Sequence, residues 1–417
     1  MIVGEVRRGL TVALRTPPRS RALPARREVP TLVAIDEGVI DRALDQALEL
    51  GEIGVQVAVY LGDELVVDAW KGVGDQASGR SVDADTLFPV FSVTKAITAT
   101  ALHLQAERGL VEYDAPVARY WPEFGRNGKE QMTVRHVLSH RSGIPQMPDG
   151  VTPELMCDWD WMVGQIASYT PYFVPGTKSG YQSLVFGWTI GEVVRRTDPA
   201  GRDFGRFIRE EICEPLGADD LWLGLPDGEL SRAAVLYGEV PDPPDPRSDM
   251  SRAAMPTAVA PVAAVHNRMD VRKACLPGAG GIMSARSAAR VFAMLANGGV
   301  LESVRLLPES RLRDCTAPRE NAQDLDLVLY GGNRFAPPIG NGGYWYGHGL
   351  MGTGPGIDCH SGAGGSVGWA DLDTRLSIVI CHNRMFEFQT TSSDLTGHPF
   401  LPFKQALQKL LPDVYRG

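Results

Sequence analysis

The 417-residue chain has no apolar run of roughly 18 residues, the length that a membrane-spanning helix needs, so no membrane contact is predicted. It also lacks an excess of positive charge, because its formal net charge is −9, and this argues against nucleic acid as a partner. No internal repeat or low-complexity tract is present. Apolar residues make up 44% and charged residues 22%, which is typical of a globular protein with one large domain or two intimate ones.

Metal-binding and disulfide patterns are missing as well. The six cysteines are scattered, with no Cys-x-x-Cys pair and no zinc-finger spacing, so we expect six reduced thiols in a cytoplasmic protein. His136 and His140 are four apart, but His-Glu-x-x-His and a nearby third ligand are absent. We interpret them as structural residues at a helix end and predict neither a metal nor an organic cofactor.

Residues 1–30 are rich in arginine and proline and lack the apolar segment of a secretory signal. An extended strap or tail is the preferred interpretation of this N-terminal extension. An organelle-targeting segment is the alternative, because such segments are rich in arginine and poor in acidic residues.

Hydrophobic periodicity predicts helices, strands and one long loop. The helices are expected at 36–50, 92–109, 133–140, 154–168, 182–196, 203–213, 284–295 and 401–412. The strands are expected at 55–60, 64–70, 344–347, 365–370 and 376–381, and the proline-rich stretch 241–278 is expected to be a loop. Strands near both ends of the chain must meet in one sheet. We therefore predict an α/β (α+β) fold, in which a central antiparallel sheet is flanked by helices.

The expected organisation is a single domain, 31–417, in two parts. Residues 31–90 and 275–417 form a sheet subdomain, residues 91–274 form a mostly helical subdomain, and a cleft lies between them.

A serine followed three positions later by a lysine begins the helix expected at 92–109. Ser92 and Lys95 are then neighbours on one helical turn, and the helix N-terminus favours negative charge on the hydroxyl. This arrangement can turn a serine into a nucleophile, although the pattern alone is common in long chains.

Two later segments supply the other parts of an acyl-transfer site. Pro175-Gly176 forms a turn that presents Tyr181 just before a helix. His360-Ser361-Gly362 begins a glycine-rich stretch at the edge of a strand, where backbone N–H groups can approach a substrate oxygen closely.

Together these motifs resemble the serine β-lactamase and penicillin-binding-protein superfamily, and most of all its class C branch and the family VIII carboxylesterases. The resemblance spans about residues 35 to 410. The segments that carry it are Phe91-Ser92-Val93-Thr94-Lys95, Asp114-Ala115-Pro116-Val117, residues 134–144, Pro175-Gly176-Thr177 with Tyr181, Gly280-Gly281-Ile282 with Ser284, and His360-Ser361-Gly362.

The resemblance implies a β-lactamase-like fold, a catalytic domain whose active site lies in the cleft between the sheet and helical subdomains, and a role for each site residue. Ser92 is the nucleophile, Lys95 helps to take its proton, and Tyr181 relays protons to the leaving group and to the deacylating water. The backbone N–H groups of Ser92 and Ala363 form the oxyanion hole. His360, Ser361 and Gly362 take the place of the lactamase Lys-Thr-Gly.

The chain departs from the family pattern at two positions. Ser183 replaces the asparagine of the usual Tyr-x-Asn, and His360 replaces a lysine, so a fixed cation becomes a titratable one. Both changes weaken the case for penicillin or a cell-wall peptide as the substrate. They fit an esterase, because an ester substrate need not carry a carboxylate. Ser183 and the 360–362 segment are therefore the expected substrate-binding residues.

A second serine motif, Gly364-Gly365-Ser366-Val367-Gly368, matches the nucleophile elbow of α/β-hydrolases. That elbow needs a helix after the serine, with an aspartate and a histidine later in the chain. A strand follows Ser366 instead, and we interpret Ser366 as a strand residue. Nearby aromatics, some of which we expect to line a substrate pocket, are Trp159, Trp161, Tyr172, Phe173, Trp345 and Tyr346.

The sequence thus predicts a serine esterase that acts on a small-molecule ester through an acyl-enzyme. An acyltransferase, or an amide, β-lactam or D-amino-acid peptide hydrolase, using the same residues is the nearest alternative. A catalytically silent binding protein is the non-enzymatic one. A homo-oligomer is left open.

Overall fold

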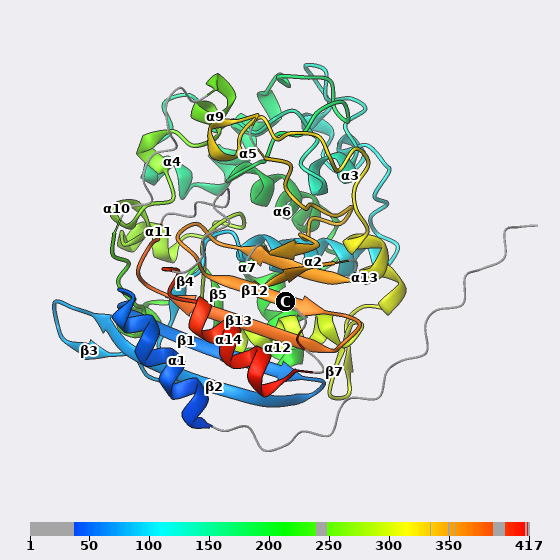
Figure 1. Ribbon diagram of the computed structural model, residues 1–417. Coiled ribbons are helices and arrows are strands. Elements are labelled where there is room, and N and C mark those ends of the chain that lie inside the picture. Colours follow the sequence, from blue (N-terminus) through cyan, green and yellow to red (C-terminus); the bar gives the residue numbers. More distant parts are fainter. Residues whose placement is uncertain are drawn as a thin grey trace, which may run out of the picture.

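A six-stranded antiparallel sheet lies at the centre of the computed structural model, which describes residues 37–238, 248–333, 335–348, 351–354, 356–386, 397–412 and 415 (Figure 1). The strand order is β11-β12-β13-β1-β2-β3. The strands are β1 (Gly54–Leu61), β2 (Glu64–Asp75), β3 (Arg80–Ser81), β11 (Ile357–Ser361), β12 (Val367–Asp371) and β13 (Leu376–His382). Strands from both ends of the chain therefore share one sheet, as predicted.

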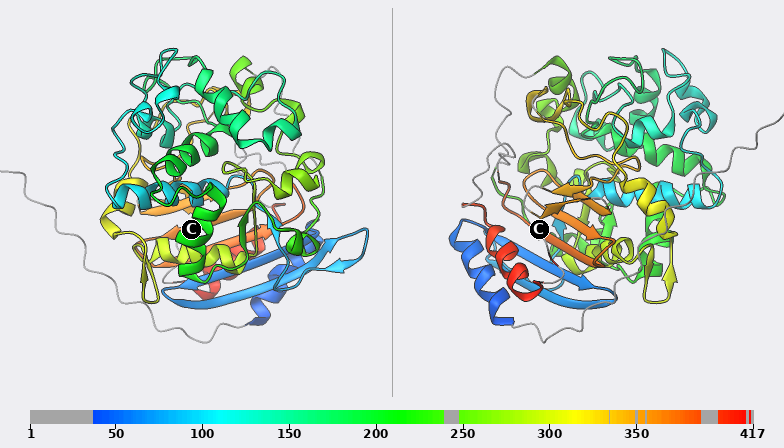
Figure 2. Two further views of the ribbon diagram at one scale, coloured as in Figure 1. Left: turned by 180° about the vertical axis from the view of Figure 1, so that it is seen from behind. Right: turned by 45° about the vertical axis from the view of Figure 1, so that its right-hand side comes forward.

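Both faces of this sheet are covered, and the burial of β1 shows it. All eight residues of β1 are buried. Val55, Val57 and Val59 belong to the core under α1 (Glu37–Glu49) and α14 (Leu401–Leu410). Ala58 and Tyr60 belong to the core on the opposite face, where α12 (Ala285–Ala296) lies against β1, β12 and β13 (Figure 2). Successive side chains of a strand point to opposite faces, so a strand covered on both sides must be apolar throughout.

The start of α12 confirms the expected cap. The Ser284 hydroxyl accepts a hydrogen bond from the Ser287 N–H, which satisfies one of the free donors of the first turn.

A mostly helical part of the chain lies on one side of the sheet, and α2 (Thr94–Glu107) lies between the two (Figure 2). This helix is buried from Thr94 to Gln105, and it contacts α6 (Val185–Thr197) in the helical part and β11 in the sheet. Its first turn therefore sits where the two parts of the fold meet.

The remaining elements complete both parts. The helices are α3 (Val134–Leu138), α4 (Pro153–Met156), α5 (Trp159–Ser168), α7 (Phe204–Ile208), η3 (Arg209–Cys213), α8 (Glu214–Leu216), α9 (Asp249–Ala254), α10 (Ala263–His266), α11 (Met269–Lys273) and α13 (Glu309–Thr316). The small sheets are β4 (Phe88–Pro89) with β6 (Gly281–Met283) and β5 (Leu221–Leu223), β7 (Val300–Leu301) with β8 (Val304–Arg305), and β9 (Gly347–His348) with β10 (Gly352–Thr353).

Four sequence expectations are wrong in detail. The helix expected at 154–168 is split, because Asp158 caps a new helix by accepting from the Trp161 N–H. The stretch 241–278 contains the short helices α9, α10 and α11 rather than a plain loop. The strand expected at 344–347 begins only at Gly347, and Ser366 lies in the turn before β12 rather than in the strand.

Within the described ranges no helix is long and apolar enough to cross a membrane. The N-terminal extension, residues 1–30, lies outside the described residues, so its predicted form is untested, as are the predicted subdomain boundaries.

Candidate active site

Ser92 lies in a strained turn directly before α2. Phe91, the preceding residue, has a φ of 49°, a left-handed conformation that bulky side chains rarely adopt. Such a residue costs on the order of 1–3 kcal/mol and persists only where its surroundings hold it. The Thr94 hydroxyl donates to the Phe91 carbonyl and accepts from the Gly281 N–H at 2.9 Å, which ties the turn to β6. Ser92 is the one half-buried residue in a buried stretch, so its hydroxyl is accessible.

Lys95 is the central group of the site. Its Nζ lies 2.8 Å from the Ser92 Oγ, 2.7 Å from the Ser183 carbonyl oxygen and 2.8 Å from the Gly278 carbonyl oxygen. The side chain is fully buried, and it forms no ion pair within the described residues. Burial therefore lowers the pKa of Lys95 well below 10.5.

In all three contacts Nζ can be the donor. Because burial favours the neutral amine, two N–H donors remain for the two carbonyls, and the lone pair can receive the proton of the Ser92 hydroxyl. Lys95 is thus arranged as a base toward Ser92.

Tyr181 completes this cluster from the loop before α6. The Ser92 side chain is near enough to the phenol to influence its pKa, and the Tyr181 ring centroid is 5.2 Å from the Lys95 Nζ. Burial raises the pKa of the Tyr181 phenol above 10.0, so the phenol keeps its proton at neutral pH. Ser92, Lys95 and Tyr181 are therefore brought together as the sequence motifs predict.

The histidine at the end of β11 differs from its expectation. His360 is fully buried, and its Nδ1 lies 2.8 Å from the Ser361 carbonyl oxygen. Burial and the nearby Lys95 lower the pKa of His360 from 6.5 to about 3. The expected titratable cation is thus a neutral imidazole at physiological pH, because a cation in a fully buried position would lose its hydration.

His360 also lies among the site aromatics. Its ring centroid is 5.3 Å from Trp345 and 6.5 Å from Tyr181. The Nδ1 contact with a carbonyl places the proton on Nδ1, which leaves Nε2 as a buried acceptor without a partner in the described part of the chain.

The glycine-rich turn after β11 lies beside the nucleophile. A Cβ on Gly362 would be 2.2 Å from the Val90 carbonyl oxygen, so only glycine permits this approach. Ala363, the next residue, is half-buried. The backbone N–H groups of Ser92 and Ala363 donate to no backbone acceptor among the described residues, which leaves both for a substrate oxygen. Their oxyanion role stays a prediction.

Ser183 contributes differently from its expectation. Its carbonyl holds Lys95, while its hydroxyl is buried and has no partner in the described residues. Ser361 is half-buried at the end of β11. Substrate contacts of either side chain remain predictions.

Three groups of the site escaped the sequence reasoning. The Gly278 carbonyl and Asp326 carry no motif that marks them, and His140 lies in the 134–144 segment but was assigned a structural role alone. Gly278 acts through its backbone, and His140 and Asp326 contact the Tyr181 loop across 42 and 145 positions of sequence. The expected structural role of His140 is incomplete for this reason, as developed below.

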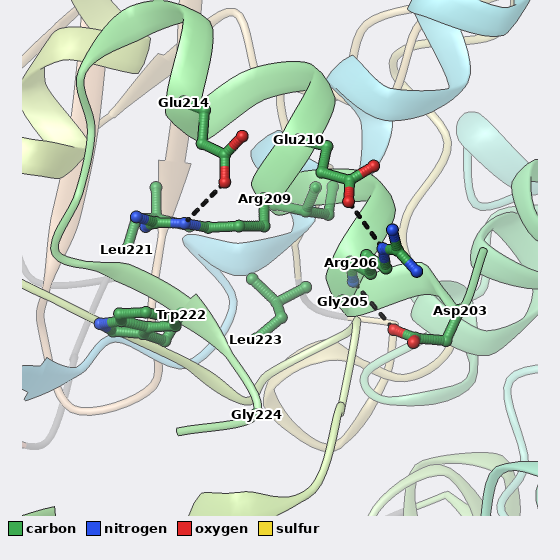
Figure 3. Close-up of a pocket in the computed structure, with 11 residues that line it drawn as sticks. Asp203, Gly205, Arg206, Arg209, Glu210, Glu214, Leu221, Trp222, Leu223 and Gly224 are labelled. Carbon is green, nitrogen blue, oxygen red and sulfur yellow. Dashed lines mark hydrogen bonds and ion pairs between the residues drawn. The ribbon is translucent and has the colours of Figure 1, made fainter. Parts of the chain in front are cut away.

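A separate pocket of about 320 Å³ lies between α7, η3 and β5 and contains none of the predicted site residues (Figure 3). Arg209 lies 4.6 Å above the Trp222 ring and pairs with Glu214, and Arg206 pairs with Glu210. The charged side chains of this pocket are thus paired with one another.

Across the described ranges no three His, Cys, Asp or Glu side chains form a group able to hold a metal ion.

Sequence comparison shows which known proteins this chain is similar to. The family model described as Beta-lactamase matches residues 40–396. Esterase/beta-lactamase LipL from Mycobacterium tuberculosis is 36% identical over 349 residues, which is 80% of this chain and 77% of that protein. Esterase EstB from Burkholderia gladioli is 31% identical over 50% of this chain and 57% of its own length.

Two solved structures are similar to this chain in fold and in sequence. A family VIII carboxylesterase has a TM-score of 0.78 and 32% identity, covering 92% of this chain and 100% of its own. A penicillin-binding protein homologue from Caulobacter crescentus has a TM-score of 0.77 and 31% identity, covering 90% and 99%.

Proposed function

The chain belongs to the beta-lactamase family, and we propose that it hydrolyses carboxylic esters through an acyl-enzyme on Ser92. One observation carries this proposal: the buried Lys95 amine, held by two carbonyls, lies 2.8 Å from the Ser92 hydroxyl. Relatives whose names include esterase, and the family VIII carboxylesterase with 32% identity, support the ester as substrate.

Acylation begins with a proton transfer. The neutral Lys95 amine takes the proton of the Ser92 hydroxyl while the Ser92 oxygen attacks the ester carbonyl carbon. The carbonyl π electrons move to the carbonyl oxygen, which the N–H groups of Ser92 and Ala363 stabilise. When the intermediate collapses, the bond to the alkoxy oxygen breaks. The Tyr181 phenol donates a proton to this leaving group and recovers one from the Lys95 ammonium.

Deacylation repeats these steps with water in place of serine. Lys95, through Tyr181, takes a proton from the water that attacks the acyl carbon. When this intermediate collapses, the bond between the acyl carbon and the Ser92 oxygen breaks, the Ser92 oxygen takes the proton back from the Lys95 ammonium, and the carboxylic acid is released. The protonated phenol of Tyr181 supports this relay, because a group that holds its proton at neutral pH can donate it to an alkoxide.

Replacing Ser92 by alanine tests the mechanism. We expect the Ser92→Ala variant to lose more than about 10⁴-fold in kcat on a p-nitrophenyl ester, and to lose labelling by a fluorophosphonate, because the acyl acceptor is gone. Unchanged turnover in the Ser92→Ala variant, or a fluorophosphonate adduct on another residue, would contradict the proposal.

Hydrolysis of a β-lactam is the second candidate, supported by the LipL relative, whose name includes beta-lactamase. The neutral His360 argues against it as the main activity, because no charged group at this position meets a β-lactam carboxylate. We expect kcat/KM for a chromogenic cephalosporin to be at least about 10²-fold below that for a short p-nitrophenyl ester. A cephalosporin turned over as fast as the ester would reverse this order.

The small-molecule ester is the one partner that we propose, and the cytoplasm is the proposed location. All six cysteines are free, which fits a reducing compartment. Titration with a thiol reagent, after unfolding without reductant, should give six thiols. A smaller number would favour an oxidising location.

A further inference from the structure

His140 has an unusual backbone conformation close to Tyr181. Its φ is 56°, in the left-handed region, and its side chain is fully buried. Histidine is among the few non-glycine residues enriched there, but the conformation still costs free energy. A buried residue in this conformation therefore needs contacts that hold it.

Those contacts surround Tyr181. The Gly180 N–H donates to the His140 carbonyl at 3.0 Å, and the Gln182 N–H donates to the His140 Nδ1, also at 3.0 Å. Between them, the Tyr181 N–H donates to the Asp326 Oδ1 at 3.2 Å. The backbone N–H groups of three successive residues, 180 to 182, are thus fixed. His140 binds the first through its carbonyl and the third through its side chain.

The imidazole also packs on the phenol. The ring centroids of His140 and Tyr181 are 4.5 Å apart, and Phe186 stacks on His140 at 4.9 Å. Because Nδ1 accepts a backbone N–H, the ring is neutral and its proton lies on Nε2. The ring orientation is fixed by this hydrogen bond, and the ring in turn limits the movement of the phenol.

We infer that His140 is a positioning residue for the reaction: it holds the Tyr181 ring beside Lys95 through its hydrogen bonds on both sides of Tyr181 and through its own ring. This inference rests on the proposed function. The phenol must move protons between Lys95, the leaving group and water, and small displacements of such a group are costly to the rate.

The variant His140→Asn separates this role from folding. Asparagine tolerates the left-handed conformation and its Oδ1 can accept the Gln182 N–H, but the ring contact with Tyr181 is lost. We expect kcat on a p-nitrophenyl ester to fall about 10- to 100-fold with KM within twofold. His136→Leu is the matched control, because His136 likewise accepts a backbone N–H through Nδ1, from Thr133 at 3.2 Å. It should keep kcat within twofold.

A double-mutant cycle with Tyr181→Phe decides whether His140 acts through the phenol. An activated nitrophenyl ester keeps the residual turnover of Tyr181→Phe measurable. In this background His140→Asn should lower kcat by no more than twofold, because the hydroxyl that it positions is already absent. Rates are expressed per folded protein, measured by circular dichroism.

Each outcome of the cycle is informative. A loss under threefold in His140→Asn alone, or an equal loss in both backgrounds, overturns the positioning role and leaves the proposed function intact. A wild-type rate in Tyr181→Phe overturns the proposed role of the phenol as well. If His140→Asn does not fold, Phe186→Leu replaces it in the same cycle. This variant removes the ring that supports His140, and the same two results decide.

Discussion

A buried lysine that pairs with no acidic side chain among the described residues is the chemical centre of this protein. The cost of burying an ammonium group exceeds what two carbonyl acceptors return, so Lys95 is stabilised as the free amine. Only in this form does it have a lone pair for the Ser92 proton. At the scale of single residues, the reactivity of Ser92 thus depends on how completely Lys95 is enclosed.

This enclosure predicts both a pH profile and a variant phenotype. Because the base must be neutral, kcat/KM should rise with pH and level off well below the free-lysine pKa of 10.5. Lys95→Arg should lose about 10²- to 10⁴-fold in kcat at every pH from 6 to 9, because arginine stays protonated. Steady-state kinetics over this range measures both.

Lys129→Arg provides the matched control for Lys95→Arg. Lys129 is also a fully buried lysine that donates to carbonyls, such as that of Arg126 at 3.0 Å, but it lies outside the Ser92 cluster. Its replacement should change stability without moving the pH profile. A Lys95→Arg enzyme with near-wild-type turnover would show that another group takes the proton.

The β11–β12 hairpin is the element that serves both site and core. One end carries His360 and the glycine-rich turn with Ala363, while Gly368 in β12 lies against α12. A Cβ at Gly368 would be 2.1 Å from the Phe292 Cζ. The motif of residues 364–368 resembles a nucleophile elbow because of its glycines. Packing against α12 and the hairpin turn account for these glycines.

Gly368→Ala should destabilise the protein by about 1–3 kcal/mol, because the added methyl group forces Phe292 and α12 away from the sheet. Urea unfolding measures this change in the free energy of unfolding. Gly228→Ala is the control, since nothing lies within 4 Å of a Cβ at that position. Equal stability of the two variants would mean that α12 adjusts without cost.

At the scale of the whole molecule, we expect buried neutral histidines to lower stability in acid. Burial lowers the pKa of His103 and His360 from 6.5 to about 3, and that of His266 to about 4. In the unfolded chain these groups bind protons below about pH 6.5, whereas in the folded protein they stay neutral. The unfolded state thus binds more protons as the pH falls.

The free energy of unfolding should therefore decrease as the pH falls from 6.5 toward 4, by up to about 1.4 kcal/mol per pH unit for each histidine. Urea unfolding at pH 7.5, 6 and 5 measures the slope. His266→Phe removes one of these groups and should flatten it. Constant stability between pH 7.5 and 5 would show that the buried imidazoles do not govern the acid response.

The sequence by itself determined the antiparallel sheet with strands from both ends of the chain, and the identity of the serine, lysine and tyrosine motifs. Alternating and helical periodicities report which side chains are buried, so local pattern was sufficient for most helices and strands. The site residues were identified from the order of several motifs along the chain and their resemblance to a known family, because Ser-x-x-Lys alone is common. The split of the 154–168 helix at Asp158 was missed, because periodicity alone does not show which polar side chain will cap a new helix.

Only the tertiary structure decided the protonation states and the supports of the site. His360 was expected to titrate, and its burial makes it a neutral acceptor. Lys95 is held by the carbonyls of Ser183 and Gly278, and the Tyr181 loop is held by His140 and Asp326. These acceptors lie 42 to 183 positions in sequence from their donors. Hydration and long-range contacts arise only when the chain is packed, and no local pattern encodes them.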